Sequence, residues 1–165
     1  MLPLIRALVY ATLFVAFVLV FVPARIIEST GITRPATIGA AQLAGGLITV
    51  LGGGLALWCV LTFALVGRGT PAPFDPPRRL VATGPYRFVR NPMYSGAGGA
   101  LAGAALFYAS LALLGYTVLF FLITHVFVVA YEEPVLRRMF GAEYEAYCAT
   151  TRRWWPLPHR EGRPR

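Results

Sequence analysis

Residues 80–96, LVATGPYRFVRNPMYSG, join two long apolar segments and decide how the chain folds. Gly84-Pro85 breaks regular structure, because glycine allows a positive φ and proline fixes its own φ and removes a donor. Asn91-Pro92 predicts the start of a helix, since Asn is a preferred N-cap and Pro suits the first turn. The free N–H groups of that turn would lie beside Arg87 and Arg90, which together suit an anionic group. A basic loop at a membrane surface is the alternative interpretation.

The composition indicates a membrane protein with a single domain, residues 1–165. Hydrophobic residues make up 57% of the chain and charged residues 13%, whereas about 25% is charged in soluble domains. The mean hydropathy is +0.63. A net charge of +8 is compatible with nucleic-acid binding, but the distribution of the arginines favours membrane orientation, so we expect no nucleic-acid partner. The two cysteines form no CxxC motif and no His/Cys cluster exists, so we expect no metal site.

The apolar segments predict an all-α, multi-pass membrane bundle of about four transmembrane helices. The first is residues 7–22, where a signal peptide is the alternative but no small-x-small cleavage site follows. Residues 23–36 read as a polar link, and the uncharged residues 38–67 exceed the roughly 20 that a span needs. Residues 95–131 would extend about 55 Å as one helix. Because a bilayer core is about 30 Å thick, we expect a tight hairpin that turns near residues 110–115.

Small residues are concentrated in the second and third predicted helices. Such residues let membrane helices approach closely, so we expect a packing role for them. They are Gly45, Gly46 and Gly52 to Gly54 in one helix, and Gly96, Gly99, Ala100, Gly103 and Ala104 in the other, including a Gly99-xxx-Gly103 motif.

The arginines predict the orientation of the bundle. With four spans, thirteen arginines lie on one side of the membrane, and Arg25 and Arg34 lie on the other side. The thirteen are those at positions 6, 68, 78, 79, 87 and 90 and the seven from position 137 onward. The positive-inside rule then places both termini and residues 80–96 in the cytoplasm. All fifteen basic residues are arginine, which points to a GC-rich genome, and we expect the inner (plasma) membrane of a bacterium.

A second polar group ends the fourth predicted helix, at Glu132, Glu133 and Pro134. Two carboxylates at this depth are costly unless they pair or meet water, and the proline should kink the helix. His125 lies seven residues before Glu132 and would share its face. The alternatives are that the carboxylates only pair with Arg87, Arg90, Arg137 or Arg138, and that His125 only bonds a neighbouring helix. Farther on, Gly141 should end one short helix, residues 143–149 should form another, and the Trp154-Trp155 pair with its arginines suits an interfacial anchor.

Three motifs in this order resemble one family. GPYRFVRNPMYSG (84–96), YEEPVLRRMFGAEYEAYC (131–148) and RRWWP (152–156) resemble the integral membrane methyltransferases related to isoprenylcysteine carboxyl methyltransferase, a group that includes phospholipid N-methyltransferases. The resemblance implies a compact helical membrane bundle that binds S-adenosylmethionine in a cytoplasmic pocket. Residues 1–66 would form the first two membrane helices, 67–158 the catalytic part and 159–165 a basic tail.

Matching positions imply a set of cofactor-binding residues: Leu80, Val81, Tyr86, Asn91, Pro92, Met93, Tyr94, Glu132 and Glu133. Many relatives have His where this chain has Asn91, and Asn cannot carry a proton. No GxGxxG or P-loop appears, so a soluble-type nucleotide site is not expected. A glutamate could bind the ammonium or ribose of the cofactor, and Tyr86 or Tyr94 could face its adenine or sulfonium.

The resemblance predicts methyl transfer to a lipophilic acceptor among the membrane lipids. Positioning and desolvation can supply the catalysis without a metal. A carboxylate acceptor, such as an isoprenylcysteine or an isoprenoid or fatty acid, is favoured because it is already ionised, whereas an amine or thiol needs a base. Tyr94, His125 and Arg90 are the candidate catalytic residues. The alternatives are phospholipid N-methylation, a non-catalytic lipid-binding protein and a membrane reductase; the last is discouraged because His125 and His159 are the only histidines.

Overall fold

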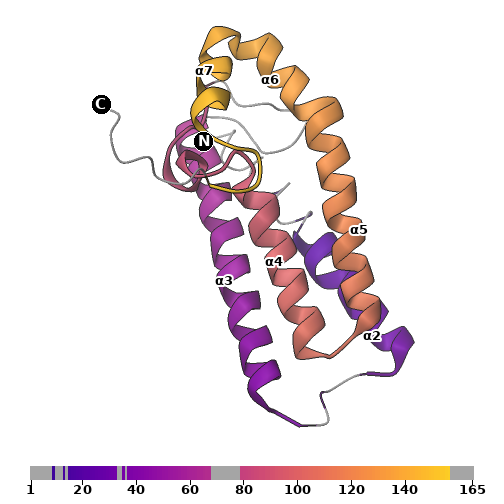
Figure 1. The fold of residues 1–165 in the computed structure, drawn as a ribbon. Helices are drawn as coiled ribbons and strands as arrows, with labels where there is room; N and C mark the ends of the chain where they lie inside the picture. The colour runs from indigo at the N-terminus through magenta and orange to yellow at the C-terminus, as the bar shows by residue number, and fades with distance from the viewer. Residues whose placement is uncertain are drawn as a thin grey trace.

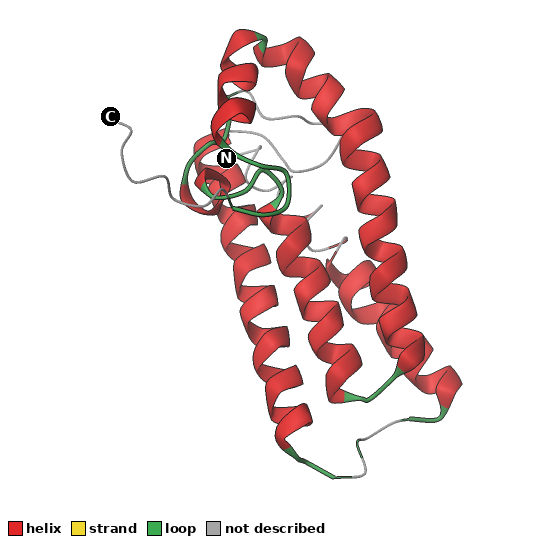
Figure 2. Cartoon of the chain, viewed as in Figure 1, coloured by secondary structure: helices red, strands yellow, loops and turns green. Residues whose placement is uncertain are grey.

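The computed structural model describes residues 9, 13, 15–32, 35, 37–67 and 79–156. In this part the chain forms helices and connecting loops, and Figure 2 shows no strand there. In chain order the elements are the π-helical turn η1 (Val15–Phe21), α2 (Val22–Thr30), α3 (Ala40–Thr62), the π-helical turn η2 (Phe63–Gly67), the 3₁₀ turn η3 (Gly84–Arg87), α4 (Pro92–Phe107), α5 (Leu111–Phe127), the π-helical turn η4 (Val128–Glu132), α6 (Glu133–Phe140) and α7 (Ala142–Thr150). The all-α prediction is confirmed for these residues.

Helix α4 lies between α3 and α5 (Figure 1) and packs against α3 backbone to backbone. A Cβ atom added to Gly52 would lie 2.5 Å from the backbone nitrogen of Ala100, and one added to Gly103 would lie 2.5 Å from that of Thr49. Gly45 and Gly96 meet the facing backbone in the same way. These four positions have room only for hydrogen, so the predicted packing role of the small residues is confirmed here.

Gly99 lies at the edge of this contact. A Cβ atom on Gly99 would lie 3.8 Å from Cα of Gly52, an ordinary van der Waals distance, whereas one on Gly53 or Gly54 would meet open space. The Gly99-xxx-Gly103 motif therefore meets α3 as expected, but only Gly103 has no room for a methyl group. Gly96, Ala100 and Gly103 follow the i, i+4, i+7 spacing that places residues on one helix face.

Two continuous helical stretches are long and apolar enough to cross a membrane. They are Ala40–Gly67 and Leu111–Phe140, whose 18-residue apolar windows have mean hydropathies of 2.1 and 2.2. Their outer faces expose large apolar side chains such as Val50 (71%) and Leu111 (83%). Helix α4 has 16 residues, or about 24 Å, and the first predicted span begins outside the described residues. Of the four predicted spans, two correspond to candidate spans in the described part of the chain, and the number four stays a prediction.

The predicted polar link at residues 23–36 is wrong in its first half, where helix α2 continues to Thr30. Pro23 lies in the first turn of α2, where a proline costs little because the π-helical turn η1 precedes it. Arg25 then pairs with Glu28 one turn later at 2.7 Å. The helix ends at Gly31, whose φ of +70° is the left-handed conformation that glycine adopts readily.

The predicted hairpin is present, with a shorter turn than expected. Helix α4 ends at Phe107, and the side chain of Ser110 accepts a hydrogen bond from the backbone nitrogen of Leu113 at the start of α5. Gly115 lies inside α5. The second helix of the hairpin does not end at Tyr131 but continues through η4 into α6. It can continue because the wider π-helical turn relieves the clash between the Pro134 ring and the preceding turn.

The polar segments gather at the end of the bundle opposite the α4–α5 turn (Figure 1). Here α6 and α7 meet at Gly141, whose φ is +49°, as the predicted break requires. Helix α7 is slightly longer than the predicted residues 143–149. Residues 68–78 and the predicted basic tail from His159 lie outside the described residues. This end of the molecule carries the candidate site.

Candidate active site

The loop before α4 places Tyr86 in the interior. Gly84 has a φ of +60° and begins the turn η3, as the Gly-Pro pair predicts. Tyr86 is 5% exposed, clusters with Cys59 and Val81, and meets the ring of Phe63 edge-on at 5.2 Å between centroids. Burial raises the pKa of Tyr86 well above its usual value, so the phenol is neutral at physiological pH.

The start of α4 is the predicted one, but Asn91 does not cap it with its side chain. Pro92 occupies the first turn, and the backbone oxygen of Asn91 accepts from the backbone nitrogen of Ser95. The Asn91 side-chain amide instead donates to the backbone oxygen of Arg153 at 3.2 Å. The expected side-chain cap is therefore absent, because a C-terminal segment uses this donor.

Glu133 is buried and paired with two arginines. It accepts from Arg153 twice, Nε to Oε1 at 2.7 Å and Nη2 to Oε2 at 2.9 Å. Arg90 Nη2 also donates to Oε1 at 3.1 Å, and the Glu133 side chain is only 7% exposed. A buried carboxylate with two guanidinium partners is satisfied in charge and in hydrogen bonds. The interpretation of a structural ion pair thus holds for Glu133, with Arg153 as an unexpected partner.

Glu132 has a different environment from its neighbour. Its Oε2 accepts from the Tyr94 hydroxyl at 3.1 Å, and Tyr94 is 8% exposed within the core cluster of Ala97, Leu101, Phe120 and Val128. Among the described residues, no arginine forms an ion pair with Glu132. Adjacent helix residues point about 100° apart, so two neighbouring carboxylates can differ in this way.

A cleft opens between these segments; its cavity volume is only about 30 Å³, and about 410 Å³ of empty space results when the open solvent at its mouth is included. It is lined by Phe63, Leu80, Val81, Tyr86, Arg90, Asn91, Glu132, Glu133, Leu136, Tyr144 and Tyr147. The walls come from η2, the loop before α4, the η4–α6 junction and α7. Two of the three motif regions seen in the sequence therefore line one cavity.

The predicted site residues divide into two groups. Leu80, Val81, Tyr86, Asn91, Glu132 and Glu133 line the cleft. Pro92, Met93 and Tyr94 lie next to it, where Pro92 is buried, Met93 packs on the core and Tyr94 reaches Glu132. The cleft thus brings together a neutral phenol, a paired carboxylate and a carboxylate without an arginine partner.

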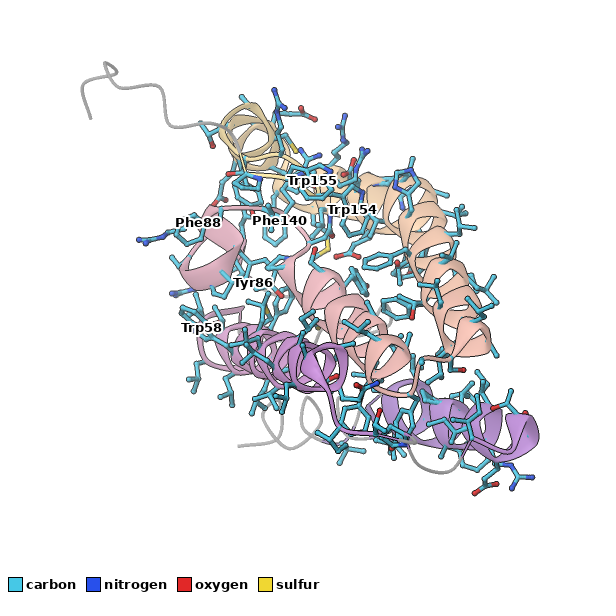
Figure 3. All side chains as sticks on the ribbon, turned by 60° about the horizontal axis from the view of Figure 1, so that its bottom comes forward. Trp58, Tyr86, Phe88, Phe140, Trp154 and Trp155 are labelled. Atoms are coloured by element: carbon cyan, nitrogen blue, oxygen red, sulfur yellow. The ribbon has the colours of Figure 1, made fainter. Side chains whose placement is uncertain are left out.

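The candidate catalytic residues occupy three different places. Arg90 lines the cleft but binds Glu133, and Tyr94 holds Glu132. His125 is exposed on α5, where its Nδ1 accepts from Trp154 Nε1 at 3.1 Å, and it does not line the cleft. The prediction that His125 and Glu132 share a face is wrong, because seven residues make two turns only in a regular α-helix and η4 lies between them. Trp154 lies on the α5 side and Tyr86 on the α3 side (Figure 3).

Sequence reasoning missed three contributors to the site. Tyr144 and Tyr147 come from α7 and line the cleft, and the Tyr147 hydroxyl donates to the backbone oxygen of Tyr86 at 2.6 Å. Arg153 follows α7 and binds Glu133. The motifs that contain these residues, YEAYC and RRWWP, can be seen in the sequence. Sequence spacing does not predict that residues beyond a helix break will line a cleft. Within the described residues, no cluster of three or more His, Cys, Asp or Glu side chains is arranged to hold a metal.

The fold and the site define a class of protein: a helical membrane bundle with a partly acidic, tyrosine-lined cleft at one end. A model of the phospholipid methyltransferase family matches residues 40–143, well over half of the chain. The chain belongs to this family, which confirms the resemblance seen in the sequence and makes it a membrane methyltransferase in general terms. Searches of curated proteins and of solved structures found no match.

Proposed function

We propose that the cleft binds S-adenosylmethionine and that the protein transfers its methyl group to a lipophilic acceptor from the membrane. The observation that carries this proposal is Glu132: a carboxylate lining the cleft, held by Tyr94, with no arginine partner among the described residues. Such a group is costly unless a cation meets it. S-Adenosylmethionine carries two positive centres, an ammonium and a sulfonium.

The residues of the cleft fit the rest of this cofactor. Glu132 would hold the ammonium or the ribose hydroxyls through charge-assisted hydrogen bonds. Tyr86, Phe63 and Tyr144 offer aromatic surfaces for the adenine or the sulfonium. When bound, the cofactor supplies a methyl group activated by the sulfonium, and this chain supplies orientation and exclusion of water. Because the 410 Å³ includes the open mouth, a ligand of this size would extend into that mouth.

A carboxylate is the acceptor that the site supports best. Acceptors that must lose a proton require a base within hydrogen-bond reach. His125 bonds Trp154 outside the cleft, Asn91 cannot titrate, Arg90 and Glu133 neutralise one another, and Glu132 is assigned to the cofactor. An ionised carboxylate on an isoprenoid, fatty or prenylcysteine-like tail needs no base, and its apolar part would enter from the lipid.

The amine of a phospholipid is the second candidate, because the matching family is that of phospholipid methyltransferases. In this case the acceptor arrives as an ammonium and Glu132 is the carboxylate free to attract it and accept its proton. The two candidates predict chemically different products, an ester and an N-methylated amine.

The arginines of the described part support a cytoplasmic location for the cleft. Arg79, Arg87, Arg90, Arg137, Arg138, Arg152 and Arg153 belong to segments at the cleft end, whereas Arg25 belongs to α2, which lies toward the α4–α5 turn (Figure 1). The positive-inside rule then turns the cleft toward the cytoplasm. With four spans both termini would be cytoplasmic as well, in a bacterial inner membrane.

Transfer of a labelled methyl group tests the function and the acceptor together. The purified protein is incubated with methyl-labelled S-adenosylmethionine and a total membrane lipid extract, and Glu132→Gln serves as the inactive control. We expect label in the lipid fraction; mild alkali releases it as methanol from an ester but leaves an N-methyl group in place. Absence of transfer to any lipid, with the fold intact, would refute the function and favour a non-catalytic lipid-binding protein.

A further inference from the structure

The C-terminal strap, residues 151–154, contacts the loop before α4 and Glu133, although it lies beyond the family match at 40–143. Its backbone pairs with the loop before α4: Val89 and Arg152 form an isolated parallel bridge, and the backbone nitrogen of Arg90 donates to the backbone oxygen of Arg152 at 2.9 Å. The Asn91 amide holds the next carbonyl, that of Arg153. Three contacts on consecutive loop residues thus fix the position from which the Arg153 side chain extends.

The Arg153 side chain binds the Glu133 carboxylate in a bidentate geometry, which a guanidinium can adopt and an ammonium group cannot. Its Nε and Nη2 donate to the two carboxylate oxygens at 2.7 and 2.9 Å. Arg90 adds the second positive charge at 3.1 Å. With Glu132, these side chains form a charge quartet of two carboxylates and two guanidiniums, which sums to zero.

We propose that Arg153 is a positioning residue that sets the charge of the cleft. Glu132 then acts as the single unpaired carboxylate of the cleft, and it determines how strongly a cationic ligand is preferred over a neutral ligand of the same shape. This inference rests on the proposed binding of S-adenosylmethionine. The product S-adenosylhomocysteine is a suitable neutral partner, because it lacks only the methyl group and the positive charge on sulfur. The quartet therefore sets the balance between substrate binding and product release.

Two single substitutions should shift this preference in opposite directions. Arg153→Met leaves the cleft with one excess negative charge and should raise the ratio of the Kd for S-adenosylhomocysteine to the Kd for S-adenosylmethionine by about two- to tenfold. Glu133→Gln leaves one excess positive charge and should lower the ratio by a similar factor. The double variant Glu133→Gln/Arg153→Met is neutral again and should return the ratio close to that of the wild type.

The test is calorimetric titration of both ligands into the full-length protein in detergent, with circular dichroism as the check on folding. Arg153→Lys keeps the charge and loses the bidentate contact, so it should retain the ratio while binding both ligands more weakly. Should Arg153→Met not fold, Glu133→Gln against the double variant gives the same comparison. A ratio that does not change in Arg153→Met and Glu133→Gln, or an equal loss for both ligands in these two variants, overturns the role of Arg153. A wild type that binds neither ligand overturns the proposed function as well.

Discussion

The hydroxyl of Tyr94 donates to Oε2 of Glu132 at 3.1 Å, joining the first turn of α4 to the last residue of η4 across 38 positions of the chain. Tyr94 is rigid because its ring is packed in the core cluster with Ala97, Leu101 and Val128. Glu132 has no described arginine partner, so this hydrogen bond is what orients it. The α4–α5 hairpin brings the two residues together at the edge of the cleft.

Removal of this hydroxyl should weaken cofactor binding without unfolding the protein. Tyr94→Phe keeps the ring in the core and leaves Glu132 free to rotate, so we expect the Kd for S-adenosylmethionine to rise about three- to tenfold. Tyr108→Phe, at the opposite end of α4, is the matched control and should bind as the wild type does. Equal affinity of Tyr94→Phe and wild type in calorimetry would show that the hydrogen bond does not orient Glu132.

The backbone contact between α3 and α4 should be sensitive to a single methyl group. Gly52→Ala places Cβ 2.5 Å from the backbone nitrogen of Ala100, and backbone atoms cannot move aside cheaply, so we expect a loss of about 1–3 kcal/mol. Gly53→Ala adds the same methyl group in open space and should be neutral or slightly stabilising. Thermal unfolding in detergent measures both, and equal midpoints for the two variants would contradict the packing of these helices.

One buried hydrogen bond between α7 and the loop before α4 should contribute to the stability of the protein. Tyr147→Phe leaves the backbone oxygen of Tyr86 without the donor that lies at 2.6 Å, so we expect a loss of about 1–3 kcal/mol in stability. Thermal unfolding at neutral pH is the measurement. Tyr108→Phe, at the other end of the bundle, is the control, and a loss of the same size there would remove the special role of Tyr147.

The same residues give stability a pH dependence on the alkaline side. Burial raises the pKa values of Tyr86 and Tyr147 above their ordinary value, so the unfolded chain releases these protons at lower pH than the folded protein. Their contribution is complete below about pH 10 and is lost as the pH rises above it. The unfolding midpoint should therefore drop as the pH rises from about 10 to about 12, and drop less in Tyr147→Phe. A larger drop in that variant would contradict the assignment.

Much of the site could be predicted from the sequence because its signals are local. Gly84-Pro85 and Asn91-Pro92 fix a turn and a helix start through backbone geometry alone, and the length of the uncharged stretch after them requires a hairpin. A hairpin then brings residues 91–94 and 132–133 to the same end of the molecule. The contact between Tyr94 and Glu132 follows from these constraints.

The remaining features depend on tertiary contacts that no local pattern specifies. Glu132 and Glu133 are chemically identical neighbours, and only the docking of the strap decides that Glu133 receives Arg153. The sequence predicts a polar link from Pro23 and a kink at Pro134, but an adjacent π-helical turn allows each helix to continue. Which glycines touch α3 depends on the rotation of α4 about its own axis.

The most direct test of the central claim is calorimetric titration of S-adenosylmethionine into the detergent-purified protein and two matched glutamate variants. Glu132→Gln removes the charge that lines the cleft, whereas Glu143→Gln makes the same change on the exposed surface of α7. We predict binding by the wild type and by Glu143→Gln, and an affinity lower by about tenfold or more for Glu132→Gln. Equal affinity in all three proteins, or no binding by a folded wild type, would contradict the claim.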